Sequence, residues 1–127
     1  MIPGLTTAQI ESIVTALAGY DCAAIYLFGS RATGTHRPDS DIDIAFLPRQ
    51  SVTPLDCFQL ANRPANALGS EVDLFDLSSA STVMAKEVIS KGIPVQITDS
   101  YAQQTFKMHT LSDYARLIEE RMGILAS

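Results

Sequence analysis

The chain has 127 residues, of which 46% are hydrophobic and 18% charged, and its formal net charge is −5. This length fits one domain with a single core, and the supply of apolar residues excludes collagen-like, coiled-coil and disordered chains. The acidic balance disfavours direct binding of DNA or RNA, which needs a cationic surface, but permits binding of a nucleotide through metal ions.

The first part of the chain predicts a helix, a strand and a helical turn. Thr6 and Gln9 have the spacing of a capping box, and apolar residues then recur at helical intervals as far as Gly19, which is placed to end the helix. Residues 23–28 are almost all apolar and predict a strand that is covered on both faces. A short helical turn is expected over residues 30–34.

A polar loop at residues 35–40 leads into the middle of the chain. Residues 41–47 alternate at their start, which predicts a strand. Residues 55–68 have the apolar spacing of a helix, but Pro64 removes a backbone hydrogen bond inside it, so we expect a kink or two short helices. Residues 72–77 predict another strand.

The last part of the chain predicts a helix at residues 81–91 that ends at Gly92, followed by a strand at 94–98. Helical spacing then predicts a final helix over about 105–125. Because helices and strands alternate throughout, we expect one small α/β domain over residues 1–127. Its predicted fold is a mixed sheet of about four strands flanked by helices, with a C-terminal helix.

The sequence carries no recognisable signal for export or membrane insertion. Its N-terminus lacks a positively charged start followed by an apolar stretch, and the longest apolar run, residues 22–28, is far shorter than the roughly 18 residues that cross a bilayer. Cys22 and Cys57 lie in apolar surroundings without a C-x-x-C pattern, which predicts reduced, buried thiols. We therefore expect a cytoplasmic protein without a membrane segment.

Asp41 and Asp43 are the first candidates for chemistry. They are two residues apart on a predicted strand, so both carboxylates should lie on one face. Two like charges this close repel each other unless a cation lies between them, and Mg²⁺ prefers such oxygen ligands. The pair therefore predicts a magnesium site.

A third carboxylate, Asp73, lies on the predicted strand at residues 72–77. If this strand neighbours that of Asp41 and Asp43, three aspartates suit two metal ions about 3.5–4 Å apart, an arrangement that clamps the attacking and leaving oxygens in phosphoryl-type transfer. Asp76 has the opposite parity to Asp73, so we expect it to face away and to have a structural role.

The turn at Gly29 and Ser30 predicts the phosphate half of the same site. Glycine lets the backbone approach a ligand, and a helical turn that starts at Ser30 directs backbone N–H groups and a hydroxyl toward an anion. Arg31 and Arg37 follow closely enough to contact a phosphate, although both would also suit surface charge. Together with Ser40, which directly precedes the aspartate pair, these are the predicted nucleotide-binding residues.

These residues resemble a known family. Gly29-Ser30, ten further residues, Asp41-x-Asp43 and a later strand aspartate are similar to the nucleotidyltransferases of the DNA polymerase beta superfamily. Within it, the chain resembles the minimal nucleotidyltransferase (MNT) subfamily, the MntA-type antitoxins of HEPN/MNT toxin–antitoxin systems, from its leading helix to residues 111–117. All signature positions are intact, which implies an active enzyme, and Pro64 departs from a helix that relatives keep continuous.

The resemblance implies a specific activity. The residues that match Asp41 and Asp43 bind two Mg²⁺ ions and the triphosphate, and the residue that matches Asp73 completes the metal site and helps to deprotonate the attacking hydroxyl. The residues that match Gly29 and Ser30 hold the phosphates. Such antitoxins transfer AMP from ATP to a tyrosine hydroxyl of a partner HEPN-family ribonuclease toxin, with which they form a hetero-oligomer, and thereby neutralise it.

The length of the chain indicates where the acceptor comes from. Only the last predicted helix lies beyond the core, so we expect another protein to bring the acceptor. Tyr114 and Ile118 on that helix either contact this partner or pack on their own sheet. Two other functions stay open: transfer to a small-molecule hydroxyl such as that of an aminoglycoside, and a purely steric antitoxin.

Overall fold

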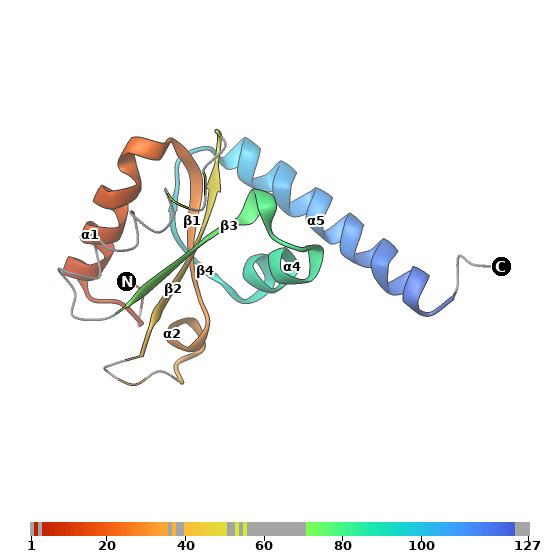
Figure 1. Ribbon diagram of the computed structural model, residues 1–127, viewed down its shortest axis with the longest axis horizontal. Coiled ribbons are helices and arrows are strands. Elements are labelled where there is room, and N and C mark those ends of the chain that lie inside the picture. Colours follow the sequence, from red (N-terminus) through yellow and green to blue (C-terminus); the bar gives the residue numbers. More distant parts are fainter. Residues whose placement is uncertain are drawn as a thin grey trace.

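One mixed sheet organises the computed structural model (Figure 1). Its strands are β1 (Cys22–Phe28), β2 (Ile42–Pro48), β3 (Val72–Asp76) and β4 (Ile93–Ile97). In the order β3-β2-β1-β4, β2 and β3 run parallel, whereas β1 is antiparallel to both β2 and β4. The predicted mixed sheet is confirmed, and each strand lies within one residue of its predicted ends. The structure describes residues 2, 4–35, 37, 40–50, 53, 55 and 71–123.

Helices cover both faces of this sheet (Figure 1). α1 (Thr7–Leu17) lies on one face, and α4 (Thr82–Lys91) and α5 (Ser100–Arg121) lie on the other. α5 continues well past the sheet as a long projecting helix (Figure 1). The remaining described elements are short: the helical turn α2 (Ser30–Thr33) and the 3₁₀ turns η1 (Ala18–Tyr20) and η2 (Leu77–Ser79).

Two apolar clusters hold these layers together, because alternate side chains of a strand point to opposite faces. All of β1 except its last residue is buried, as predicted for a strand that is covered on both sides. The cluster on the α1 face contains Leu5, Ile13, Leu17, Cys22, Ile25, Leu27, Ile42, Ile44, Phe46 and Val72. The cluster on the α4 and α5 face contains Ala23, Ala24, Tyr26, Ala45, Leu47, Leu77 and Val88.

The start of α1 agrees with the sequence, but its end does not. The Thr6 hydroxyl accepts a hydrogen bond from the Gln9 backbone N–H, and the Gln9 side chain accepts one from Thr6, so the capping box is confirmed. The prediction that Gly19 ends the helix was wrong. α1 tightens into the 3₁₀ turn η1 instead, and the left-handed residue that follows is Asp21, at φ 45°.

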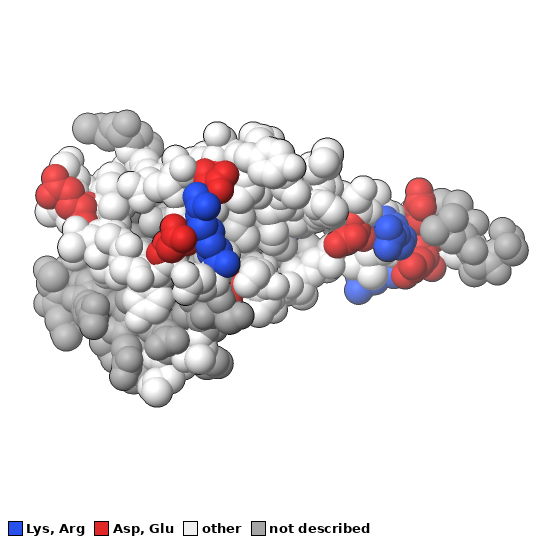
Figure 2. All heavy atoms as spheres, turned by 90° about the horizontal axis from the view of Figure 1, so that it is seen from above, with Lys and Arg blue, Asp and Glu red and all other residues white. Residues whose placement is uncertain are grey.

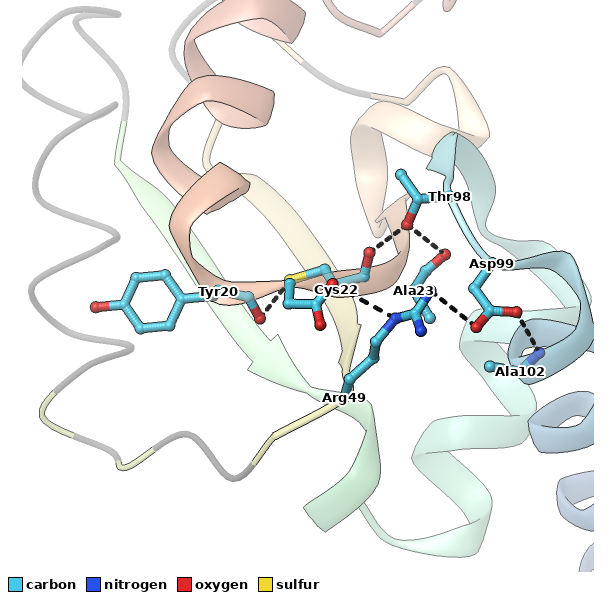
Figure 3. Close-up of polar contacts among 8 residues, drawn as sticks. Tyr20, Cys22, Ala23, Arg49, Thr98, Asp99 and Ala102 are labelled. Atoms are coloured by element: carbon cyan, nitrogen blue, oxygen red, sulfur yellow. Dashed lines mark hydrogen bonds and ion pairs between the residues drawn. The ribbon is translucent and has the colours of Figure 1, made fainter.

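α5 begins five residues earlier than the predicted residue 105. Its start is fixed by Asp99, whose Oδ1 accepts a hydrogen bond of 3.0 Å from the backbone N–H of Ala102, an N-cap that lies outside the apolar pattern. Thr98, just before it, donates its hydroxyl proton to the carbonyl oxygens of Cys22 and Ala23 (Figure 3). Polar contacts therefore set where the helix begins.

Arg49 ties the start of α5 to the sheet (Figure 3). Its Nη2 lies 2.8 Å from Oδ2 of Asp99, and its Nε lies 3.5 Å from Oδ1 of Asp21. Its backbone N–H also donates to the carbonyl oxygen of Asp21. These contacts join the end of β2, the start of β1 and the first turn of α5 at one end of the sheet.

Three further expectations concern membranes, thiols and the third helix. Within the described residues, no helix is long and apolar enough to cross a membrane. Cys22 is a buried free thiol, as predicted, and burial raises its pKa to about 11. Cys57 and the helix expected at 55–68 with its Pro64 kink lie outside the described residues, apart from Leu55.

Candidate active site

Asp43 and Asp73 lie side by side on the parallel strands β2 and β3, as directly paired residues of the register. They point to the face of the sheet that α4 and α5 partly cover, because their neighbours Ile42, Ile44 and Val72 belong to the cluster on the α1 face. Asp73 was predicted to join the site if its strand neighboured the strand of Asp41 and Asp43. The two strands are neighbours, so this condition is met.

Asp41 lies just before β2 and is exposed. The pairing of β2 with β3 begins directly after it, where the backbone N–H of Ile42 donates to the carbonyl oxygen of Glu71 at 2.8 Å. Asp41 is still close enough for its charge to act on Asp43. Among the residues that the structure describes, no three aspartate, glutamate, histidine or cysteine side chains are placed together so that they could hold a metal ion.

The environment of Asp43 raises the pKa of its carboxyl group to about 6. Burial is the largest cause, followed by the negative charges of Asp73 and Asp41 and by the hydrogen bond between the Asp43 and Asp73 side chains. The two carboxyl groups thus share a site that is stable with a proton or a cation between them. A set of carboxylate oxygens with this excess of negative charge fits a hard divalent cation such as Mg²⁺.

Gly29 packs directly against Asp43. It follows Phe28, which pairs with Asp43 across β1 and β2. A Cβ atom at position 29 would overlap Oδ2 of Asp43, and the backbone at φ 74° and ψ −154° is a conformation that essentially only glycine adopts. Glycine is therefore required both for the turn and for the space that the Asp43 carboxylate occupies.

Ser30 is half-buried at the start of α2, one residue after the exposed Gly29. The turn is closed by the backbone N–H groups of Ala32 and Thr33, which both donate to the carbonyl oxygen of Gly29 at 3.1 and 3.2 Å. The structure therefore brings Ser30 to the same end of β1 as the carboxylate pair, as the predicted phosphate site requires.

Arg31 is buried and braces the segment in front of Asp41. Its Nη2 and Nε donate to the carbonyl oxygen of Ser40 at 2.8 and 3.2 Å, and its Nη1 donates to the carbonyl oxygen of Gly4 at 3.1 Å. The guanidinium thus fixes the backbone one residue before the aspartate pair. A phosphate contact by Arg31 stays a prediction.

Arg37 and Ser40 lie in the loop that Arg31 braces. The hydroxyl of Ser40 accepts a hydrogen bond of 2.7 Å from the backbone N–H of Arg37, and the side chain of Arg37 is exposed. Asp76, in contrast, has the structural role that was predicted. Its Oδ1 accepts hydrogen bonds from the backbone N–H and the hydroxyl of Ser78, which caps η2.

Sequence reasoning missed an aromatic pair beside the carboxylates. The rings of Phe28 and Phe75 meet edge to face, with centroids 5.1 Å apart. Phe75 has the same parity as Asp73 on β3, and Phe28 pairs with Asp43. The period of two that placed Asp73 could have placed Phe75 as well, but not its contact with a ring two strands away.

Comparisons with known proteins agree with this geometry. Residues 11–101 match the family described as Polymerase beta, Nucleotidyltransferase. The chain is 42% identical, over 101 residues, to the protein adenylyltransferase MntA of Shewanella oneidensis strain MR-1, and the match covers 80% of this chain and 72% of that protein.

Two solved structures are similar over nearly the whole chain. One is a toxin–antitoxin crystal structure with AMP-PNP, at 37% identity and a TM-score of 0.81, covering 92% of this chain and 95% of that one. The other holds a tri-AMPylated Shewanella oneidensis HEPN toxin in complex with its MNT antitoxin, at 33% identity and a TM-score of 0.78, covering 96% and 97%.

Proposed function

The chain belongs to the polymerase beta nucleotidyltransferase family, and we propose that it is an antitoxin that transfers AMP from ATP to a tyrosine hydroxyl of a HEPN-family toxin. The similar adenylyltransferase, the complex with AMP-PNP and the complex with an AMPylated toxin support this function. Modification of the toxin neutralises it. The single observation that carries the proposal is the Asp43–Asp73 pair packed against Gly29.

Asp41, Asp43 and Asp73 are the residues that would hold Mg²⁺, two ions in the proposed active state. When bound, the metal supplies positive charge that stabilises the triphosphate and the developing negative charge. The pKa of Asp43 is raised to about 6 in the absence of a cation, so a proton competes with the ion for this carboxylate only below about pH 6. Asp73, exposed at β3, accepts the proton of the attacking hydroxyl.

The nucleotide lies with its phosphates at the turn after β1. Gly29 leaves the backbone open to the phosphates, and the hydroxyl of the half-buried Ser30 donates to a phosphate oxygen. Arg37 and Ser40 approach from the neighbouring loop, and Arg31 contributes both charge and the bracing of that loop. The acceptor oxygen attacks the α-phosphorus in line, and pyrophosphate leaves.

The acceptor is carried by a partner protein, so the active assembly is a hetero-oligomer. Residues 1–127 form one nucleotidyltransferase domain in this proposal. Its described sheet and covering helices supply the nucleotide site and the core. Ile118 on the projecting part of α5 is 38% exposed, and Tyr114 is half-buried beneath the ammonium of Lys86, 4.8 Å from its ring centroid. The large exposed apolar residues beyond the first turn of α5 support a protein contact there: Met108, Leu111 and Ile118.

The surface charges on one face of the molecule support a nucleotide enzyme that does not bind nucleic acid there. On the face shown in Figure 2, basic side chains are flanked by acidic ones, both over the body and toward the far end of α5. The described residues on this face therefore present no continuous basic track of the kind that follows a phosphate backbone. ATP and Mg²⁺ are abundant in the cytoplasm, where the reaction takes place.

The test is catalytic neutralisation of the toxin. Wild-type protein, added at a small fraction of the toxin concentration with ATP and Mg²⁺, should progressively abolish its ribonuclease activity. The Asp41→Ala/Asp43→Ala double variant should have no effect at the same ratio. Equal neutralisation by wild type and the double variant at equimolar protein, with neither active at the small fraction, would instead identify a steric antitoxin. Modification of an aminoglycoside without any partner would identify a small-molecule enzyme.

A further inference from the structure

The Phe28–Phe75 pair lies at the boundary between the catalytic carboxylates and the apolar core. Phe28 packs against the cluster on the α4 and α5 face, so one ring of the pair is anchored. Phe75 is 38% exposed, and it lies on β3, the edge strand of the sheet, between the half-buried Leu74 and Asp76. An aromatic ring that is exposed to solvent beside charged groups contributes less to folding than a buried ring does. Phe75 is therefore a candidate for a role in the site.

The sheet register explains how the two rings meet. Phe75 of β3 pairs with Ala45 of β2, whose side chain is small, and Asp73 and Asp43 form the row next to them. Because Ala45 fills little space above β2, Phe75 and Phe28 reach across it from the two flanking strands. The edge-to-face contact then fixes the orientation of the Phe75 ring, directly beside the carboxylate row.

Phe75 lies two residues beyond Asp73 on β3, the strand that is farther from the phosphate turn. Gly29 and Ser30 follow β1, on one side of β2, whereas Phe75 belongs to β3, on the other side. The two strands that flank β2 also differ in chemistry, since β1 leads into a turn with a partly exposed hydroxyl, whereas β3 presents Asp73 and an exposed aromatic ring. A triphosphate suits the first flank, and an apolar ring suits the second.

We infer that Phe75, held by Phe28, seats the phenol ring of the acceptor tyrosine and orients its hydroxyl toward the carboxylates. This inference rests on the proposed function and adds a residue that determines acceptor specificity. A seat of this kind favours a phenol over an aliphatic hydroxyl, because only the phenol has a ring that packs against Phe75.

The experiment compares Phe75→Ala, Phe75→Leu and Phe75→Trp with wild type. Two quantities are measured: kcat/KM for the cognate HEPN toxin in the AMP-transfer assay, and the Kd of AMP-PNP by titration calorimetry without the toxin. Tyr101→Ala is the matched control, since Tyr101 is an aromatic residue that is 84% exposed and lies in the first turn of α5, which begins beside the start of β1, whereas Gly29 follows its end. Thermal unfolding of each variant checks that it is folded.

Loss of the ring in Phe75→Ala and Phe75→Leu should lower kcat/KM for the toxin about tenfold, as expected for one aromatic contact, with the Kd of AMP-PNP unchanged. Phe75→Trp should keep most of the activity, and Tyr101→Ala should match wild type.

Wild-type kcat/KM in Phe75→Leu would overturn the inference and leave the proposed function intact. A weaker Kd for AMP-PNP in Phe75→Ala would also overturn it, because the ring would then contact adenine. Absence of transfer by wild type would overturn the proposed function, and the inference with it.

Discussion

At the scale of single residues, Asp43 is the point on which the site depends. It pairs with Asp73 across two parallel strands, packs against Gly29 and has a carboxyl pKa raised to about 6. Each of these features destabilises the ionised side chain or restricts its neighbours. A cation between the two carboxylates removes the repulsion, so the same features that strain the metal-free protein favour binding of a metal.

This raised pKa predicts how stability depends on pH. The folded protein binds the Asp43 proton more tightly than the unfolded chain, so the resulting stabilisation is complete below the unfolded pKa and is lost as the pH rises through about 6. In metal-free buffer, the stability of wild type should therefore fall relative to Asp43→Asn by about 1–2 kcal/mol between roughly pH 4.5 and pH 7.

The measurement is the free energy of unfolding of both proteins by urea across this pH range. Addition of Mg²⁺ at neutral pH should stabilise wild type and leave Asp43→Asn nearly unchanged. Parallel pH profiles for the two proteins would contradict the role assigned to the Asp43 carboxyl group.

Gly29→Ala should abolish activity through sterics. The new Cβ would overlap Oδ2 of Asp43, and the backbone conformation at position 29 is essentially restricted to glycine. We expect kcat to fall by about a hundredfold or more, as displacement of a catalytic group does. Gly34→Ala is the control. Its backbone is also left-handed, at φ 79°, but no atom lies within 4 Å of the added Cβ, so its activity should stay within about threefold of wild type in the same assay.

Sequence alone placed most of the polar residues of the site but not all of their contacts. The period of two along a strand was enough to place Asp73 beside Asp43 and to turn Asp76 away. Arg31 was predicted as a phosphate ligand or a surface charge, yet its described hydrogen bonds join segments that are far apart in the chain. Contacts such as Arg31 with Gly4, or Phe75 with Phe28, depend on tertiary packing that no local pattern records.

At the scale of elements, the clamp around Asp99 determines how α5 leaves the sheet. Asp99 both caps the helix and pairs with Arg49 (Figure 3). The Arg49 side chain is 43% exposed, so the ion pair alone contributes little, whereas the cap satisfies a backbone donor of the helix. The apolar pattern missed the first turn of α5 for this reason, because its start is encoded by one polar side chain.

Two substitutions separate the cap from the ion pair. Arg49→Ala should lower the free energy of unfolding by less than about 1 kcal/mol, since it removes only partly exposed ion pairs. Asp99→Ala should cost about 1–2 kcal/mol, because it also removes the cap. Chemical denaturation of both variants in parallel measures the difference. A larger loss for Arg49→Ala than for Asp99→Ala would contradict the view that the cap is the main contribution.

At the scale of the whole molecule, more than half of the net charge of −5 lies in the proposed site. Asp41, Asp43 and Asp73 account for three of these charges, so removing them from the count leaves −2. The excess of acid is thus concentrated in one proposed site instead of being spread over the surface. Two bound Mg²⁺ ions would reverse the sign of the local field and make it attractive to a triphosphate.

The chemistry of the transferred group is the most direct test of this account. The toxin is incubated with the protein and Mg²⁺ together with ATP labelled either at the α-phosphorus or at the γ-phosphorus. We predict that the α label becomes covalently attached to the toxin while the γ label is released in pyrophosphate, and that both EDTA and Asp43→Asn abolish the attachment. Attachment of the γ label, or α labelling that persists in Asp43→Asn, would contradict adenylyl transfer at the Asp43–Asp73 pair.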